Sequence, residues 1–322
     1  MDRDTSASNY RQDLPTRRRE MLRHIGIDEA GYGPRLGPLV VGYSVFEGPG
    51  NPEARFAAVD EHHRPRDSKL LLQGKHGFRR LETLALAAHF YVTGRRPSTI
   101  RDLFPDEVGA RDAHPWYRDR NLSLPHVAPW GEVERVSEAI RNAASGEASN
   151  LISAGVRIIP EGELNRRIEQ GQNKAEVHLG LIGQVLLGFL SEAGCHRVDV
   201  DRLGGRKHYG SWLQHLQPEA PVWVVEETQR RSAYRVLSAK SNREFQFLVG
   251  GESRSTPIAL ASCMAKYMRE LLMILFNTWW LQRAPIRATA GYPEDAARFL
   301  RELDLHCPED LQKFLGTLVR LK

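Results

Sequence analysis

The sequence predicts an α/β fold in which a mixed sheet is flanked by helices. Strand-like runs and helical runs interleave along the chain, an order that is typical of this class. Several strand-like runs end at acidic residues or at glycine-rich turns, as strands do where they leave a sheet. The 322 residues suffice for one large domain with insertions or for two smaller ones.

Composition excludes several other classes of protein. With 41% hydrophobic and 26% charged residues, the chain is not wholly disordered, collagen-like or a coiled coil. The 45 lysines and arginines exceed the 40 acidic residues by five, which permits a polyanionic partner without requiring one. The three cysteines form neither a disulfide framework nor a zinc pattern, which indicates a reducing compartment.

No segment has the roughly 20 apolar residues that a membrane-spanning helix needs. Residues 1–20 lack an apolar signal core, and their mixture of aspartate, serine, proline and arginine predicts a disordered basic arm. We therefore expect a cytoplasmic protein without a membrane partner, and we expect it to be a monomer.

The first clear element is a hairpin at residues 24–46. Ile25 and Ile27 occupy alternate positions of a strand that ends at Asp28 and Glu29. A turn rich in glycine and proline follows and leads into a second apolar run, which is typical of a hairpin with a wide loop.

Most of the remaining chain is predicted to form helices and strands. Helical spacing predicts helices at 76–93 (or a helix that runs into a strand), 131–145, 163–192 (broken near Gly171) and 258–280. Alternation predicts strands at 155–159, 198–201, 221–226, 233–238 and 245–249. Residues 283–322 are predicted to be a C-terminal helical extension, with Pro293 near the start of a helix.

Residues 96–130 differ from the rest of the chain. They are rich in arginine, aspartate, proline and histidine and show little periodicity, so we interpret them as an irregular insertion. Their aromatic residues, Trp116, Tyr117 and Trp130, could stack on nucleic-acid bases or pack the insertion onto the core. Packing is the more common use of such residues.

Three strand-like segments end in acidic residues, namely Asp28-Glu29, Asp201 and Glu252. Carboxylates at the ends of neighbouring strands can converge on one point, where they repel one another unless protons or divalent cations neutralise them. Oxygen ligands suit Mg²⁺ or Mn²⁺, and two such ions about 4 Å apart support phosphodiester cleavage. Acids at strand ends are also common as solvated turn residues, so the pattern alone leaves both interpretations open.

The segments around these acids carry motifs in a definite order. IDEAGYGPRLGPLVVG starts at Ile27, RDSKLL starts at Arg66, and the strand ending in Asp201 follows. GESRSTPIALASCMAKYMREL then places Glu252 ten residues before the serine of an Ala-Ser-x-x-Ala-Lys segment, and AGYPEDAARFLREL comes last. In residue pattern and in order, these segments resemble the motifs of the type 2 ribonuclease H family (ribonuclease HII-like), of which this chain would be a divergent member.

The resemblance implies a ribonuclease H-like domain over residues 21–282, with the insertion at 96–130. It also implies metal-dependent hydrolysis of the RNA strand of RNA/DNA hybrids, or of ribonucleotides embedded in DNA, to 3′-hydroxyl and 5′-phosphate products. A two-metal site for Mg²⁺ or Mn²⁺ is implied, and no organic cofactor. The alternatives are a weak or inactive nucleic-acid-binding protein of the same fold and a nuclease directed at DNA.

The resemblance further assigns roles to individual residues. The catalytic, metal-binding acids would be Asp28, Glu29, Asp201 and Glu252. The residues that contact substrate would be Gly31, Tyr32 and Gly33 at the ribose 2′-hydroxyl, Lys69, Arg206 and Lys266 at phosphates, and Tyr292 at the RNA–DNA junction.

The chain departs from the family pattern at three positions. Tyr32 stands where the family has arginine, Glu252 where it usually has aspartate, and Arg202 where it usually has glycine. Asp199 lies two residues before Asp201 and shares its face of the strand, so it is the alternative ligand. We prefer Asp201 because it lies at the strand end.

Two further features have two interpretations each. Asp67 is either a helix cap or a functional acid. The loop at 204–210 (GGRKHYG) is either a solvated turn or a phosphate contact. The glycine-rich segment after Glu29 lacks the Gly-Lys-Ser/Thr ending of a phosphate-binding loop, which disfavours an ATPase.

Overall fold

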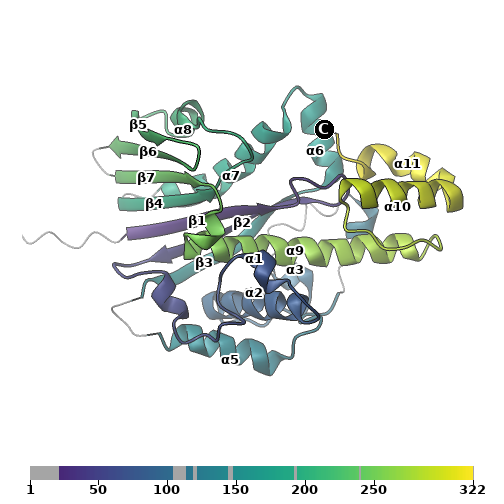
Figure 1. The fold of residues 1–322 in the computed structure, drawn as a ribbon, viewed down its shortest axis with the longest axis horizontal. Helices are drawn as coiled ribbons and strands as arrows, with labels where there is room; N and C mark the ends of the chain where they lie inside the picture. Colours follow the sequence, from purple (N-terminus) through teal and green to yellow (C-terminus); the bar gives the residue numbers. More distant parts are fainter. Residues whose placement is uncertain are drawn as a thin grey trace, which may run out of the picture.

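A mixed seven-stranded sheet with the strand order β3-β2-β1-β4-β7-β6-β5 forms the centre of the structure (Figure 1). The computed structural model describes residues 22–103, 114–118, 122–143, 148–191, 194–238 and 241–321, so the predicted arm at 1–20 lies outside the described residues. The strands are β1 (Leu22–Ala30), β2 (Leu39–Glu47), β3 (Asn150–Ile159), β4 (Gly194–Asp201), β5 (Val222–Glu227), β6 (Arg231–Ser238) and β7 (Ser241–Leu248).

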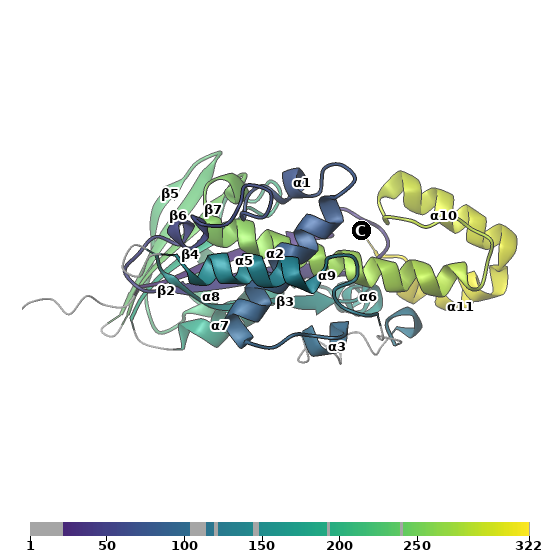
Figure 2. The ribbon, with the colours of Figure 1, turned by 90° about the horizontal axis from the view of Figure 1, so that it is seen from below.

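Helices cover both faces of this sheet (Figures 1 and 2). One hydrophobic core joins the sheet to α2, α5 and α9, and a second core joins the opposite face to α7 and α8. The α-helices are α1 (Ser68–Leu71), α2 (Gly77–Thr93), α3 (Ile100–Leu103), α5 (Trp130–Arg141), α6 (Glu161–Glu169), α7 (Lys174–Leu190), α8 (Gly210–Leu216), α9 (Thr256–Leu281), α10 (Pro293–His306) and α11 (Pro308–Leu318). Short 3-10 turns are η1 (Glu53–Phe56), η3 (Pro115–Tyr117) and η4 (Gly251–Ser253).

The strand directions bring the acidic strand ends to one edge of the sheet. β1 pairs in parallel with β4, and β4 pairs in parallel with β7, whereas β2 is antiparallel to β1. Ile27 lies opposite Val200, and Asp201 lies opposite Leu248. Because parallel neighbours end on the same side, the residues that close β1 and β4 and the turn after β7 lie next to one another.

Two glycines let α9 lie directly on the sheet. A Cβ on Gly26 of β1 would come within 2.0 Å of the carbonyl carbon of Pro257, and one on Gly42 of β2 within 2.0 Å of the carbonyl oxygen of Ala261. Only glycine allows backbone to approach backbone this closely. The close contact brings the next turns of α9, with Ser262 and Lys266, beside the acidic strand ends.

The predicted mixed sheet flanked by helices, with a C-terminal helical portion, is confirmed. The hairpin is the antiparallel pair β1–β2, and the helix expected at 163–192 is interrupted near Gly171, as α6 and α7. β3 starts five residues before the predicted strand at 155–159, because its first half also pairs with β2.

Packing is also confirmed as the role of two aromatic residues of the insertion. Trp116 and Tyr117 are fully buried, and the Trp116 ring lies 5.7 Å from the Phe276 ring of α9 and 6.0 Å from that of Trp280. Trp130 starts α5 and packs, half-buried, against the same core. Trp116 and Tyr117 are therefore buried in the core and are not presented for stacking on bases, whereas the Trp130 ring lies 6.4 Å from the Phe90 ring of α2.

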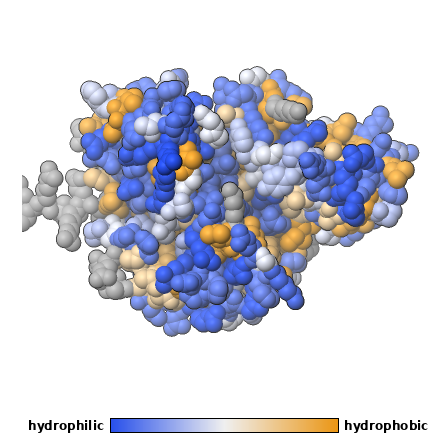
Figure 3. All heavy atoms as spheres, viewed as in Figure 1, coloured by the Kyte–Doolittle hydropathy of each residue, from blue (hydrophilic) through white to orange (hydrophobic). Residues whose placement is uncertain are grey.

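The face of the molecule shown in Figure 3 is mostly hydrophilic, with smaller apolar patches between the charged residues. Among the described residues, no helix has both the length and the apolar character that crossing a bilayer requires.

Candidate active site

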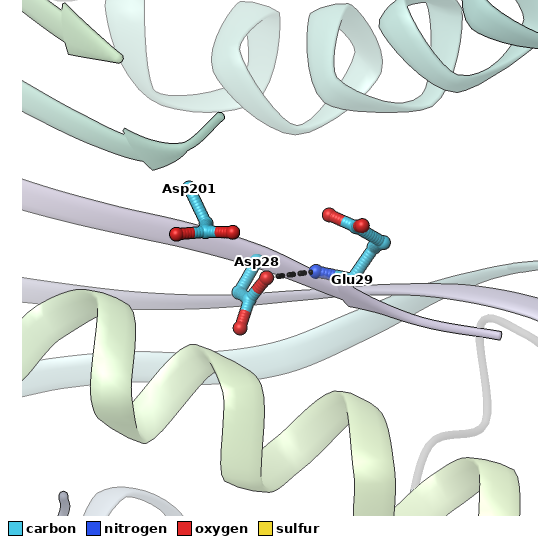
Figure 4. A group of neighbouring side chains, drawn as sticks. All are labelled: Asp28, Glu29 and Asp201. Carbon is cyan, nitrogen blue, oxygen red and sulfur yellow. Dashed lines mark hydrogen bonds between the residues drawn. The ribbon is translucent and has the colours of Figure 1, made fainter. Parts of the chain in front are cut away.

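Three carboxylates come together where β1 and β4 end. One carboxylate oxygen from each of Asp28, Glu29 and Asp201 lies within 4.8 Å of the other two, and the side chains face a common space in Figure 4. Asp28 Oδ1 accepts a hydrogen bond from Glu29 N at 2.7 Å, and Asp201 Oδ1 accepts one from Gly251 N at 2.7 Å. We refer to these three residues as the acidic cluster.

Glu252, in the turn after β7, lines the same cavity but lies outside the acidic cluster. Its Oε2 accepts hydrogen bonds from Ser68 N, at 2.7 Å, and from the Ser68 hydroxyl. Lys266 Nζ lies 3.5 Å from Oε1. The carboxylate is therefore paired with α1 and α9, and it borders the cluster as a fourth acid.

Burial and mutual repulsion raise the pKa values of Asp28 and Glu29 in the acidic cluster. Burial raises the pKa of Asp28 well above its usual value, and the charges of Glu29, Asp201 and Glu252 raise it further. Burial, followed by the charge of Asp201, raises the pKa of Glu29 to about 7, although Lys266 lowers it. Near neutral pH these acids cannot all be ionised without a compensating positive charge.

The buried side chain beside Glu29 does not supply that charge. His178 Nε2 lies 3.8 Å from Glu29 Oε2, but burial lowers the pKa of His178 to about 3, so the ring is neutral at neutral pH. The donor set suits a hard divalent cation, because it consists of carboxylate oxygens held close together. Asp28, Glu29 and Asp201 could hold such an ion, and Glu252 could join them after turning from Ser68.

The remaining wall of the cavity, whose volume is about 320 Å³, contains two cations, an exposed ring and a further acid, Glu270. Lys266 and Arg269 project from α9, and Tyr292, which is 55% exposed, precedes α10. The Arg269 guanidinium lies 5.9 Å from the centre of the Tyr292 ring. Positive groups and an aromatic face beside clustered acids suit a polyanion that carries sugars or bases.

The loop of residues 31–37, which we call the glycine loop, borders the cavity on the side of β1. Gly31 has a φ of +87°, a conformation that favours glycine, and it lines the cavity. Gly33 is exposed, with open space where a Cβ would be. The Tyr32 ring lies 5.6 Å from the His178 ring, and Lys174 Nζ lies 4.6 Å from the centre of the Tyr32 ring. A positive charge is thus present beside the tyrosine.

The other predicted phosphate contacts lie in different surroundings. Lys266 lines the cavity but is paired with Glu252 and Ser68. Lys69 lies in α1, and its side chain is outside what the structure describes. Arg206 does not line the cavity; its Nε donates to the carbonyl oxygen of His208, so its phosphate contact stays a prediction.

Arg202, a departure from the family pattern, has a structural role. Its buried guanidinium donates to the carbonyl oxygens of Arg206 at 2.6 Å, of Thr228 at 3.0 Å and of Gln229 at 2.8 Å. It thereby ties the loop after β4 to the turn between β5 and β6, directly behind Asp201.

The alternative ligand, Asp199, lies away from the cavity. Its side chain is fully buried and accepts hydrogen bonds from Ser255 Oγ at 2.8 Å and from Arg197 Nε at 3.1 Å. His24 Nε2 lies 2.8 Å from its Oδ2. The structure therefore places Asp201, and not Asp199, beside Asp28.

Sequence reasoning missed several residues of this region. Arg269 and Glu270 follow Lys266 by three and four positions on α9, and this helical spacing was the available signal. Ser68 belongs to the RDSKLL segment, but its bond to Glu252 spans 184 positions and had no local signal. The proximity of His178 to Glu29 had none either.

No protein-family model matches the chain, and no curated protein matches it. Solved structures similar to it include a point mutant of Bst-RNase HIII, with 17% identity, a TM-score of 0.47 and coverage of 92% of this chain. This chain spans only 66% of the length of that protein.

Two further solved structures are similar. Bst-RNase HIII in complex with Mn²⁺ has 17% identity, a TM-score of 0.41 and coverage of 93% of this chain and 66% of its own. Ribonuclease H2 from Pyrococcus horikoshii OT3 has 15% identity, a TM-score of 0.42 and coverage of 92% of both chains. The three structures are of two ribonucleases H, and this sequence carries motifs that resemble those of the type 2 ribonuclease H family.

Proposed function

We propose that this chain is a metal-dependent endonuclease that hydrolyses the RNA strand of RNA/DNA hybrids, or ribonucleotides embedded in DNA, to 3′-hydroxyl and 5′-phosphate products. The acidic cluster carries this proposal, since three carboxylate oxygens within 4.8 Å and raised carboxyl pKa values favour a divalent cation. The motif resemblance supports the choice of substrate.

In this proposal, the acids of the cavity bind metal and its cations contact the phosphate backbone. Asp28, Glu29 and Asp201, joined by Glu252, would hold Mg²⁺ or Mn²⁺. A bound pair of such ions would supply a lower pKa for the attacking water and charge stabilisation for the departing 3′-oxygen. Lys266 and Arg269 orient the phosphate backbone from α9.

The ribose lies against the glycine loop in this proposal. The backbone at Gly31 and Gly33 approaches the 2′-hydroxyl. A Cβ on Gly31 would lie 2.5 Å from Pro38 O, whereas the space beside Gly33 is open. Tyr292, exposed at the rim of the cavity, contacts the sugar or base at the RNA–DNA junction.

Cleavage of defined duplexes tests the proposal. We would incubate the protein with Mg²⁺ or Mn²⁺ and with a labelled RNA/DNA hybrid, a DNA duplex carrying one ribonucleotide, or an all-DNA duplex. We expect cleavage of a ribonucleotide-containing substrate, and a loss of at least about a hundredfold in Asp28→Asn. Asp304→Asn, an exposed position on α10, is the matched control and should retain full activity.

Other outcomes separate the alternatives. Tight binding of the hybrid without cleavage in either metal would identify a nucleic-acid-binding protein. Equal cleavage of the all-DNA duplex would identify a DNA-directed nuclease.

A further inference from the structure

The glycine loop has no regular secondary structure of its own, so its carbonyl groups need other partners. One side chain, Arg320, which follows α11, supplies several of them. Its Nε donates to Gly37 O at 2.7 Å, its Nη1 donates to Pro34 O at 3.3 Å, and Gly31 O accepts a further bond from Nη1. A single guanidinium therefore binds the loop at its start, middle and end.

Arg320 is itself held in a buried environment. Only 3% of the residue is exposed, and burial lowers its pKa to about 10, so it stays charged at neutral pH. The fully buried Glu161 of α6 opposes this lowering. Glu161 Oε1 also accepts hydrogen bonds from Gly37 N at 3.0 Å and from the Tyr117 hydroxyl at 3.1 Å. Burial raises the pKa of Glu161 to about 7. The carboxyl of Glu161 and the guanidinium of Arg320 thus bind the N–H and the carbonyl of Gly37.

The backbone around Arg320 adds a second attachment. Arg320 N donates to Arg35 O at 2.9 Å, while Arg35 N and Leu36 N donate to Gly291 O at 2.7 and 3.2 Å. Gly291 directly precedes Tyr292. The glycine loop is therefore attached both to the segment after α11 and to the segment before α10.

We propose that Arg320 is a positioning residue that sets the shape of the glycine loop and thereby its discrimination between ribose and deoxyribose. This inference rests on the proposed function, in which the backbone of the loop approaches the 2′-hydroxyl. Arg320 acts through the loop, since its guanidinium is occupied by loop carbonyls. Lysine would not replace it fully, because one ammonium group cannot span the acceptors that a planar fork reaches.

The test compares Arg320→Lys and Arg320→Met with wild type, and uses Arg301→Met, at an exposed position of α10, as the matched control. Hydrogen exchange of the backbone amides of residues 31–33 and 35–37 gives a readout that needs no activity. We expect faster exchange in the glycine loop of Arg320→Met, unchanged exchange in β1 and α9, and an intermediate result for Arg320→Lys.

Kinetics and metal binding supply the second readout. For a DNA duplex with one ribonucleotide, we expect KM to rise about tenfold in Arg320→Met while kcat stays within about threefold of wild type, because the shape of the binding loop is lost. The preference for this duplex over all-DNA duplex should fall by a similar factor. Mn²⁺ affinity should be unchanged, since the acidic cluster does not contact Arg320.

The possible results separate this inference from the proposed function. If wild type cleaves no ribonucleotide-containing substrate, the proposed function fails, whereas unchanged loop exchange in Arg320→Met overturns the positioning role by itself. Faster loop exchange with unaltered ribose preference would also overturn the inference. If Arg320→Met does not fold, Arg320→Lys decides: wild-type KM and wild-type preference in that variant would contradict the proposal.

Discussion

Asp28 and Glu29 are adjacent on β1 and therefore point to opposite faces of the sheet, yet both belong to the acidic cluster. The Asp28 carboxylate is within hydrogen-bonding reach of Ser262 on α9, whereas the Glu29 carboxylate lies 3.8 Å from His178 on α7. Both carboxylates line the same cavity because β1 ends at Ala30, directly after them. At the strand end, side chains from the two faces of the sheet can reach one cation.

The raised pKa of Glu29 predicts how the stability of the metal-free protein depends on pH. Because burial raises this pKa from 4.5 to about 7, the native state binds more protons than the unfolded state in that window, so stability falls as the pH rises through it. Above pH 7, Glu29→Gln should be more stable than wild type by about 1–3 kcal/mol, and the difference should vanish below about pH 4. Urea unfolding in a chelator at several pH values measures this.

Metal addition provides the control for that prediction. Mn²⁺ should stabilise wild type above pH 7 and should stabilise Glu29→Gln much less, since a ligand has been lost. A metal-free Glu29→Gln protein that is less stable than wild type at every pH would show that the surroundings of Glu29 do not disfavour its ionised form.

At the scale of elements, the contact of α9 with β1 and β2 decides whether the two sides of the site meet. The strands carry Asp28 and Glu29, and the helix carries Ser262 and Lys266. The helix can approach the strands only because small residues face it at the contact, Gly42 among them.

We predict that Gly42→Ala damages both stability and the site. The new Cβ would lie 2.0 Å from Ala261 O, so α9 must shift, at a cost of about 3 kcal/mol. Thermal unfolding and Mn²⁺ affinity measure the two effects, and both should fall. In Gly180→Ala the added methyl group meets open space on α7, so that variant should be as stable as wild type or more stable by up to about 1 kcal/mol. Equal behaviour of the two variants would contradict this account of the contact.

At the scale of the whole molecule, the charge is distributed unevenly relative to the site. The chain carries a net charge of +5, yet the cavity gathers acids at its centre and places Lys266, Arg269 and Tyr292 around them. A polyanion would therefore be attracted to the surroundings of the cavity and would need cations at its centre.

We predict that the affinity for an RNA/DNA hybrid depends strongly on salt. Each neutralised phosphate releases counterions, so the dissociation constant should rise at least about tenfold between roughly 50 and 200 mM monovalent salt. Fluorescence anisotropy at a constant Mn²⁺ concentration measures it, and Arg269→Met should flatten the dependence relative to Arg301→Met. An affinity that does not change with salt would contradict binding through the phosphate backbone.

The local patterns of the sequence determined much of this picture. Alternation and helical spacing predicted the β1–β2 hairpin, the interrupted helix at α6 and α7, and the long helix α9, because these signals depend on neighbours in sequence. The positions of Asp28, Glu29 and Asp201 at strand ends were visible for the same reason, and the order of motifs pointed to a family of nucleases.

Only the tertiary structure decided which of these groups meet. Asp199 and Asp201 share one face of β4, and their separation into a buried pair with His24 and a member of the acidic cluster follows from what packs on each. The attachments of Glu252 to Ser68 and of the glycine loop to Arg320 join residues 184 and more than 280 positions apart. Hydrogen bonds and Coulomb forces act over a few ångströms, whatever the distance along the chain, so the packing of helices on the sheet had to bring these partners together first.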